Sequence, residues 1–244
     1  MPMKKTLFIL SIIPVFVFAK EKENKQQFSI STGYVQTTGN TETSTANIKT
    51  KYTYKTDSKR IYFDLNAVYG STNGKKSSEY IDGNIRFEKR KFPYFFFWDI
   101  HYYRNPFQGY KHSIGTGPGI GRYFYHNAQS YLSLSYYVYY VYNDLNQPSL
   151  YTNKYFERYF LHHIEERFKK KFTKSLKFTQ KLVYKVSSRK RQDYFVYFES
   201  SIINSFTKHL ALEISYTINY QNLPLGSKIK RLDTTLSTLV QYNF

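Results

Sequence analysis

The segment LALEISYTINYQ, residues 210–221, alternates two kinds of side chain at successive positions. Its even-numbered residues are Leu, Ile or Tyr, and its odd-numbered residues, apart from Ala211, are polar. An α-helix repeats its apolar positions every three or four residues, whereas a β-strand repeats them every two. The segment therefore predicts a strand with one apolar face and one polar face.

The same period of two runs through nearly the whole chain after Lys25. Breaks at Gly, Pro, Asn, Asp and charge clusters divide the chain into predicted strands. There are twelve, with ranges of 26–37, 42–55, 60–69, 78–90, 94–104, 112–125, 130–142, 154–168, 175–187, 193–205, 209–221 and 231–244. Most exceed the roughly 9–11 residues that a tilted strand needs to cross a bilayer. The faces of 154–168 and 193–205 stay unassigned, because bulky side chains occupy both.

The connections between these segments alternate in length. Longer ones follow odd-numbered segments, as at 70–77, 143–153 and 222–230, and tighter ones follow even-numbered segments, as at 91–93 and 126–129. Outer-membrane barrels show this difference, with short turns on the periplasmic side and longer loops outside. The pattern therefore favours a membrane barrel whose strands follow one another in a meander.

A secreted β-sandwich is the soluble alternative, but its strands are usually shorter. Disorder is excluded because 20% of the residues are aromatic, and a disulfide framework is excluded because the chain has no cysteine. Beyond the first 19 residues no apolar stretch is long enough for a membrane-spanning helix. We therefore predict an all-β fold: a single transmembrane antiparallel up-and-down β-barrel of about 12 strands over residues 20–244.

The first 19 residues, MPMKKTLFILSIIPVFVFA, have the composition of a cleaved secretory signal peptide. Lys4 and Lys5 precede an apolar run that ends at Ala19, a small residue suited to cleavage. The net charge of the whole chain is +19, which would ordinarily suggest nucleic acid. Export to the bacterial outer membrane removes that partner and predicts instead the anionic groups of outer-membrane lipids and lipopolysaccharide.

Three stretches resemble the bacterial family of putative salt-induced outer-membrane proteins, domain of unknown function 481. They are the hairpin GYVQTTGNTETST at 33–45, the glycine-rich GTGPGIGRYF at 115–124, and the final strand from Asp233 to Phe244. Pro118 departs from the family's glycine strand. The resemblance implies an outer-membrane barrel and implies no substrate.

Glycine alternates with other residues at 115, 117, 119 and 121. A phosphate-binding loop would place its glycines between a strand and a helix, and no helix is expected here. The preferred interpretation is a glycine row on one barrel face, which leaves space for large side chains opposite. Pro118 then points to the other face and predicts a bulge.

The face opposite the apolar one predicts the lumen lining. The lumen candidates on this face are Asp64, Asp82, Arg86, Glu88, Asp99, His101, Lys177, Lys181, Lys185, Glu213 and Asp233. The same face also contains Lys49, Lys51 and Arg231. Acidic and basic residues are nearly balanced in this set. Such a balance predicts ion pairs across a narrow bore rather than a strongly anion-selective pore.

Two residue groups invite a chemical interpretation. A serine hydrolase needs Ser113 and a histidine on one face, but adjacent residues such as His112 and Ser113 point to opposite faces. In the eighth segment His163 can share a face with Glu165, or His162 with Glu166. A metal site there is the alternative to a lumen hydrogen-bond network that includes Arg167. No cofactor is expected.

These patterns predict a non-enzymatic barrel, acting as a narrow passive channel or as an envelope protein under osmotic stress. An outer-membrane lipid-modifying enzyme, resembling a phospholipase barrel, is the alternative. The final strand, in which Tyr242 and Phe244 share one face, resembles the signal by which the outer-membrane assembly machinery selects its clients, and we expect it to act as that signal. It must also pair with the first strand, since open edges are not tolerated in lipid.

Overall fold

A computed structural model of the protein describes residues 26–38, 43–72, 75–149, 152–226 and 229–244. The predicted signal peptide lies outside these residues. One short 3₁₀ helix, η1 (Pro106–Gln108), accompanies the strands. The strands are β1 (Gln26–Thr38), β2 (Thr43–Lys55), β3 (Lys59–Thr72), β4 (Lys75–Lys91), β5 (Tyr94–Asn105), β6 (Tyr110–His126), β7 (Ser130–Leu145), β8 (Phe156–Lys171), β9 (Leu176–Ser187), β10 (Tyr194–Ser205), β11 (Leu210–Gln221) and β12 (Leu232–Asn243).

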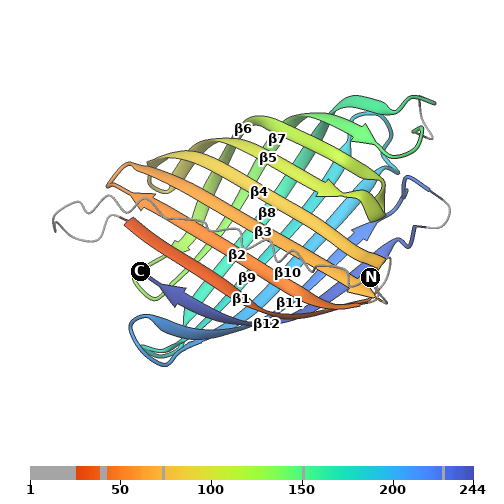
Figure 1. Cartoon of the computed structure of the whole chain (residues 1–244). Helices are drawn as coiled ribbons and strands as arrows, with labels where there is room; N and C mark the ends of the chain where they lie inside the picture. Colours follow the sequence, from red (N-terminus) through yellow and green to blue (C-terminus); the bar gives the residue numbers. More distant parts are fainter. Residues whose placement is uncertain (1–25, 39–42, 73–74, 150–151, 227–228) are drawn as a thin grey trace, which may run out of the picture.

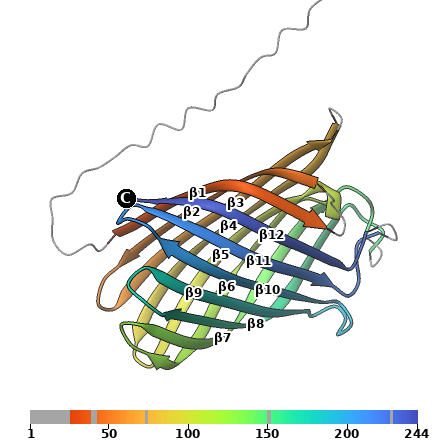
Figure 2. The same ribbon diagram turned by 90° about the horizontal axis from the view of Figure 1, so that it is seen from below.

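The strands form one closed antiparallel barrel in which each strand pairs with its neighbour in sequence (Figures 1 and 2). The barrel closes where β1 pairs with β12, in a register that runs from Ser29 opposite Asn243 to Thr38 opposite Thr234. A closed ladder satisfies every strand edge, which is the requirement for a sheet in lipid. The predicted fold class is confirmed. Within the described residues, no helix has the length and apolar character needed to cross a membrane.

The two ends of the barrel differ in their connections. At the end that we call the turn side, β2–β3, β4–β5 and β6–β7 are joined by residues 56–58, 92–93 and 127–129. At the opposite end, the loop side, residues 146–155 and 222–231 join β7–β8 and β11–β12. The short and long connections thus lie at opposite ends of the barrel, as the alternating connection lengths in the sequence predict.

The prediction of a longer connection at 70–77 is wrong. The flanking strands extend through most of it, so that Thr72 lies opposite Lys75 and Gly70 lies opposite Ser78. The register shifts between Gly70 and Ser71, which accommodates the extra residue as a bulge. The glycine and polar residues of this segment therefore belong to the bulged end of a long hairpin and not to a loop.

Alternation along the strands separates an apolar outer surface from a polar interior. On β11 the outward Ile214 and Tyr216 are 46% and 42% exposed, whereas the inward Glu213 and Ser215 are each 1% exposed. Leu236 and Val240 on β12 likewise lie on the outer surface. Because the exposed side chains are the apolar ones, the outside of the barrel is suited to hydrocarbon and the inside to water.

The bulge predicted at Pro118 is also wrong. Pro118 lies opposite Trp98 on β5, and the register with β7 is the same before and after it, with Thr116 opposite Tyr140 and Gly119 opposite Tyr137. The register of β6 shifts instead near its two ends, between Tyr110 and His112 and between Tyr123 and Tyr125. Gly117, next to Pro118, lets β6 lie close to β7, because a Cβ atom there would meet the backbone carbonyl oxygen of Val138.

Candidate functional site

The glycine row of β6 allows aromatic rings to fill one side of the lumen. A Cβ atom added at Gly119 would meet the side chains of Phe97 and Tyr137, and one at Gly121 would meet Phe95. These rings belong to a buried cluster on β5 to β8 that we call the aromatic wall. Its members are Phe95, Phe97, Tyr123, Tyr137, Tyr139, Val141, Tyr159 and Leu161. The open part of the lumen therefore lies toward the remaining strands.

A cavity of about 420 Å³ occupies this open part. It is lined from β2 to β12, including Lys51, Asp64, Lys181 and Asp233. A second cavity of about 140 Å³ lies toward the loop side, and both cavities are lined by Asp82, His101 and Lys185. The shared residues make the two cavities neighbouring parts of one polar lumen.

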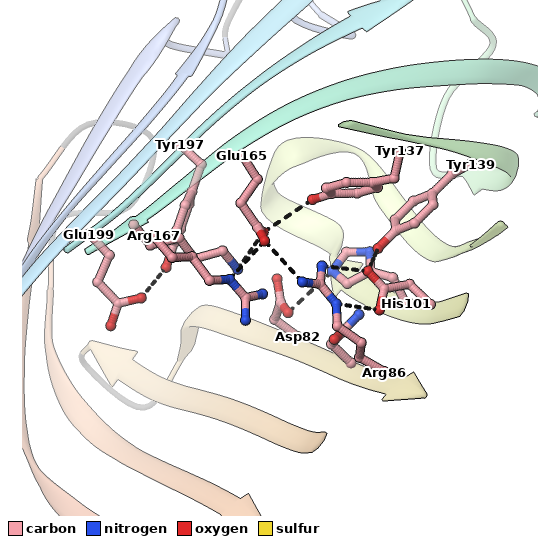
Figure 3. A network of polar contacts seen from close by, with 12 residues as sticks. Asp82, Arg86, His101, Tyr137, Tyr139, Glu165, Arg167, Tyr197 and Glu199 are labelled. Atoms are coloured by element: carbon pink, nitrogen blue, oxygen red, sulfur yellow. Dashed lines mark hydrogen bonds and ion pairs between the residues drawn. The ribbon is translucent and has the colours of Figure 1, made fainter. Parts of the chain in front are cut away.

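Arg86 on β4 is the centre of the charged network in the lumen (Figure 3). Its guanidinium binds both carboxylate oxygens of Asp99 on β5, with Nε–Oδ1 at 2.8 Å and Nη2–Oδ2 at 2.7 Å. The guanidinium carbon lies 3.9 Å from the centre of the Phe97 ring. A bidentate pair with a ring below it holds the arginine in one orientation. Only 3% of Arg86 is exposed.

Glu165 on β8 joins several cations to this network. Its Oε1 accepts from Nη1 of Arg86 at 3.1 Å and lies 2.7 Å from Nε of Arg167. Nζ of Lys181 lies 3.7 Å from Oε2, and the Tyr137 hydroxyl donates to the same oxygen at 3.3 Å. A buried carboxylate needs such compensation, because desolvation otherwise outweighs the gain from one ion pair.

Two smaller polar groups line the cavity beside this network. Lys49 lies 3.1 Å from Glu199 and 3.3 Å from Glu213, so it bridges β2 to β10 and β11. On the other side, His101 lies 3.2 Å from Asp82, which also accepts a hydrogen bond from the Tyr80 hydroxyl at 3.2 Å. The charged side chains are thus held in fixed positions by partners on other strands.

The loop side of the lumen is covered by packed apolar residues. Leu225, from the β11–β12 connection, is buried against Tyr110 and Leu145, with Tyr103 and Ile229 at the edge; we call this group the apolar cap. The Gln147 side chain donates to the Leu225 carbonyl at 2.8 Å. The cap therefore narrows the passage between the loop side and the cavity.

A buried ion cluster supports the loops beside the cap. The guanidinium of Arg189 lies 2.7 Å from both Glu157 and Asp193, and its carbon lies 3.8 Å from the centre of the Tyr159 ring. Burial raises the pKa of the Asp193 carboxyl, although the hydrogen bond from Arg189 acts in the opposite direction. Ser149 donates to Glu157 from the neighbouring loop. The cluster ties the β7–β8 and β9–β10 connections together.

The residues expected in the lumen lie on its inner surface, but not all reach the cavity. The structure places eight in the lining of the larger cavity: Asp64, Asp82, Arg86, Asp99, His101, Lys181, Lys185 and Asp233. Glu88 is buried near Arg60 at 3.9 Å, Glu213 is buried against Lys49, and Lys177 lies at the turn-side end of β9. Arg231 lines the smaller cavity.

Sequence reasoning left the part of the site from β8 and β10 unassigned: for β8 it offered either His163 with Glu165 or His162 with Glu166, and for β10 it offered no residue. His163, Glu165 and Glu199 all line the cavity, yet both strands were left without assigned faces. The usable signal in β8 was short: His163, Glu165 and Arg167 share one face, and Glu165 pairs with Arg167, but His162 and Glu166 on the other face are polar too. His163 stacks on Tyr137 with ring centres 4.3 Å apart, and its Nδ1 lies 3.0 Å from the Leu161 carbonyl oxygen.

The candidate chemical groups do not converge on a reaction centre. The Ser113 hydroxyl donates to Asn143 at 2.7 Å, while His112 lies on the outer surface with Nδ1 2.9 Å from the Tyr102 hydroxyl. His162 also faces outward, 2.7 Å from the Tyr136 hydroxyl. Within the ranges that the structure describes, no three His, Asp or Glu side chains are arranged to hold a metal ion.

These features define the class of the protein as a twelve-stranded transmembrane β-barrel with a polar, partly filled lumen. The family described as "Protein of unknown function, DUF481" matches residues 30–244, and the chain belongs to this family. The suspected resemblance is therefore confirmed. No curated protein matches the chain in sequence.

Solved barrels share the fold at very low sequence identity. The NanC porin superimposes with a TM-score of 0.60 at 7% identity, covering 88% of this chain and 98% of that one. A bacterial polysaccharide outer-membrane secretin reaches 0.50 at 6% identity, covering 92% and 100%. The KdgM porin reaches 0.49 at 10% identity, covering 88% and 99%. The likeness to the NanC porin and to the secretin shows a common architecture.

Proposed function

We propose that the protein is a narrow passive channel of the bacterial outer membrane that admits small polar solutes. The observation that carries the proposal is the polar cavity of about 420 Å³ inside a barrel whose outer surface is apolar. A barrel that served only as a structural element could fill its lumen with side chains. The shared fold of the NanC porin supports the same interpretation.

The charges around the cavity predict weak selectivity between anions and cations. The acidic lining residues are Asp64, Glu79, Asp82, Asp99, Glu165, Glu199 and Asp233. The basic ones are Lys49, Lys51, Arg86, Arg167, Lys181 and Lys185. Since the two sets are nearly equal and largely paired, the field along this part of the lumen favours neither sign strongly.

Planar-bilayer recording tests the proposal. Purified protein should give small conductance steps, and the reversal potential in a salt gradient should stay near zero. Swelling of proteoliposomes in small neutral sugars provides a second measure of permeation. Absence of both conduction and swelling from folded barrels would contradict the channel and leave the envelope-structure role as the better account.

A lipid-modifying enzyme has less support. It needs a nucleophile, a base and an oxyanion site near the lipid, yet Ser113 bonds to Asn143 inside the lumen and His112 to Tyr102 outside. Incubation of the protein with phospholipid vesicles, followed by mass spectrometry of the lipids, distinguishes the two roles. Release of fatty acid that requires Ser113 would favour the enzyme.

Export and location form part of the same proposal. Cleavage after Ala19 would remove the apolar leader, and the apolar outer surface of the barrel would then require insertion into a bilayer. The intact mass of the membrane-extracted protein should correspond to a chain that starts at Lys20. Lipopolysaccharide and the assembly machinery are the proposed partners of its outer surface and its terminal strand.

A further inference from the structure

The turn-side mouth of the lumen carries a group of lysines that the ion-pair network leaves out. Lys55 ends β2, Lys169 and Lys171 end β8, and Lys177 lies at the start of β9; we call these four the mouth lysines. Each shares the strand face of residues that line the cavity. Lys169 follows Arg167 by two positions, and Lys177 precedes Lys181 by four.

These like charges lie close to one another. Lys171 is directly opposite Lys177 in the pairing of β8 with β9. Lys169 is within electrostatic range of the other three and of Arg60. Lysines placed directly across a strand pair repel each other and destabilise the sheet. A barrel that keeps this arrangement carries a local cost that a bound anion would relieve.

The nearby acids are already paired with other cations. Glu213 is within electrostatic range of Lys177, but its carboxylate lies 3.3 Å from Lys49. Glu88 faces Arg60 at 3.9 Å, and Arg90 donates to the backbone carbonyls of Thr56 and Asp57. In the described part of the chain, none of the mouth lysines makes an ion pair or a side-chain hydrogen bond. The middle of the lumen is different, since Arg86, Lys49 and Arg167 there each contact a carboxylate.

We propose that the turn-side mouth is a binding site for soluble polyvalent anions that bear phosphate or carboxylate groups. Several amines converge on one opening, so a ligand with several charges gains from all of them, whereas a monovalent ion gains from few. The amines follow the lumen face, which favours a solute over a lipid. Lys59, Lys89 and Lys170 occupy the opposite face of their strands and are the residues placed for lipid phosphates.

Calorimetric titration of inorganic tripolyphosphate into the folded barrel in nonionic detergent tests the site. Wild type should bind, and binding should weaken as sodium chloride screens the charges. The double variant Lys169→Gln/Lys177→Gln should bind several-fold more weakly, at roughly threefold to fivefold per charge removed. The matched control Lys89→Gln/Lys170→Gln removes the same net charge from the outer face and should bind as wild type does.

Two results would overturn the site: no heat of binding at low salt, or equal weakening by the inner and outer double variants. Both variants are first checked for the heat-dependent gel shift of a folded barrel. Anionic phospholipid added to the detergent tests whether lipid phosphates bind at the same lysines. Only the outer variant, Lys89→Gln/Lys170→Gln, should then bind less lipid than wild type. The titration needs no ion flow, so its outcome is independent of whether the barrel conducts.

Discussion

Nη1 of Arg86 on β4 and Oε1 of Glu165 on β8 lie 3.1 Å apart, although the strands that carry them are not neighbours in the barrel. The contact therefore spans the lumen rather than following the wall. Both side chains are almost fully buried, at 3% and 1% exposure. A fixed bridge of this kind restricts the bore at mid-height and leaves the open cavity beside it.

Replacing Arg86 should destabilise the barrel. In Arg86→Met the carboxylate of Asp99 would keep only the Tyr139 hydroxyl, at 2.9 Å, from its present partners in the network. Loss of one member of a buried pair typically costs about 3–5 kcal/mol. Urea unfolding in detergent, followed by tryptophan fluorescence, measures the change.

The matched control for Arg86 is Arg122→Met, because Arg122 contacts the rings of Tyr94 and Phe124. It should cost less than about 1 kcal/mol, the usual scale of an exposed cation–π contact. The double variant Arg86→Met/Asp99→Asn should recover part of the lost stability, since it also removes the charge of Asp99, whereas Glu165 still has Arg167 as a partner. Equal stability of the two single variants would contradict a central role for Arg86.

Adding one methyl group at Gly117 should also destabilise the barrel. A Cβ there would meet the backbone carbonyl of Val138, which cannot rotate away as a side chain does. Overpacking of this kind costs about 1–3 kcal/mol. Gly83→Ala is the control, because its added Cβ would meet only Leu65 at an ordinary 3.6 Å. The temperature of the gel shift should fall for Gly117→Ala and stay unchanged for Gly83→Ala.

Shortening Leu225 should loosen the apolar cap without opening the strand ladder. Leu225→Ala removes contacts with Tyr110 and Leu145, and burial of this type is worth about 2–5 kcal/mol. Hydrogen exchange should then rise in peptides that cover 106–110 and 145–149. Leu232→Ala, at a position that is 49% exposed, provides the same truncation without cap contacts. Faster exchange in both variants, or in neither, would argue against the cap.

Removal of Phe244 should reduce assembly more than strand content. Its ring centre lies 5.2 Å from that of Phe28, and its amide donates to the Phe28 carbonyl at 3.0 Å, so the residue joins the two strands that close the barrel. Most of the deletion variant should be found in the periplasmic fraction. Phe124→Ala, another exposed outer aromatic, is the control. Equal outer-membrane yields at low expression would contradict a role in assembly.

Periodicity predicts a strand well where the lumen face is polar. On β11 the inward Glu213 and Ser215 contrast with Ile214 and Tyr216, and both the strand and its faces are as the alternation predicts. The same contrast exists on β3, where Asp64 lines the cavity. A two-residue period is visible only where the two faces of a strand differ in polarity. It therefore predicts the faces correctly wherever one face meets water and the other meets lipid.

The same reasoning fails beside the aromatic wall. On β8 the inward Tyr159 and Leu161 are as bulky as the outward Phe160, so composition does not separate the faces. On β10 the inward Phe195 and Tyr197 are likewise as bulky as the outward Phe198. With bulky side chains on both faces, the alternation does not say which face is inward, and this is why Glu165 and Glu199 could not be assigned to the lumen.

The pairing of β1 with β12 gives the barrel a distinct order of formation. Every other pair of neighbouring strands is a hairpin of consecutive segments, but Ser29 and Asn243 meet from opposite ends of the sequence. The entropy lost on joining such distant segments exceeds that of a short hairpin by about 3 kcal/mol, because the cost grows with the logarithm of the separation. Hairpins can therefore form early and in any order, whereas the pairing of β1 with β12 is a late and slow event. Substitutions along this one seam should change how fast the barrel closes, whereas those elsewhere should change how long it stays closed.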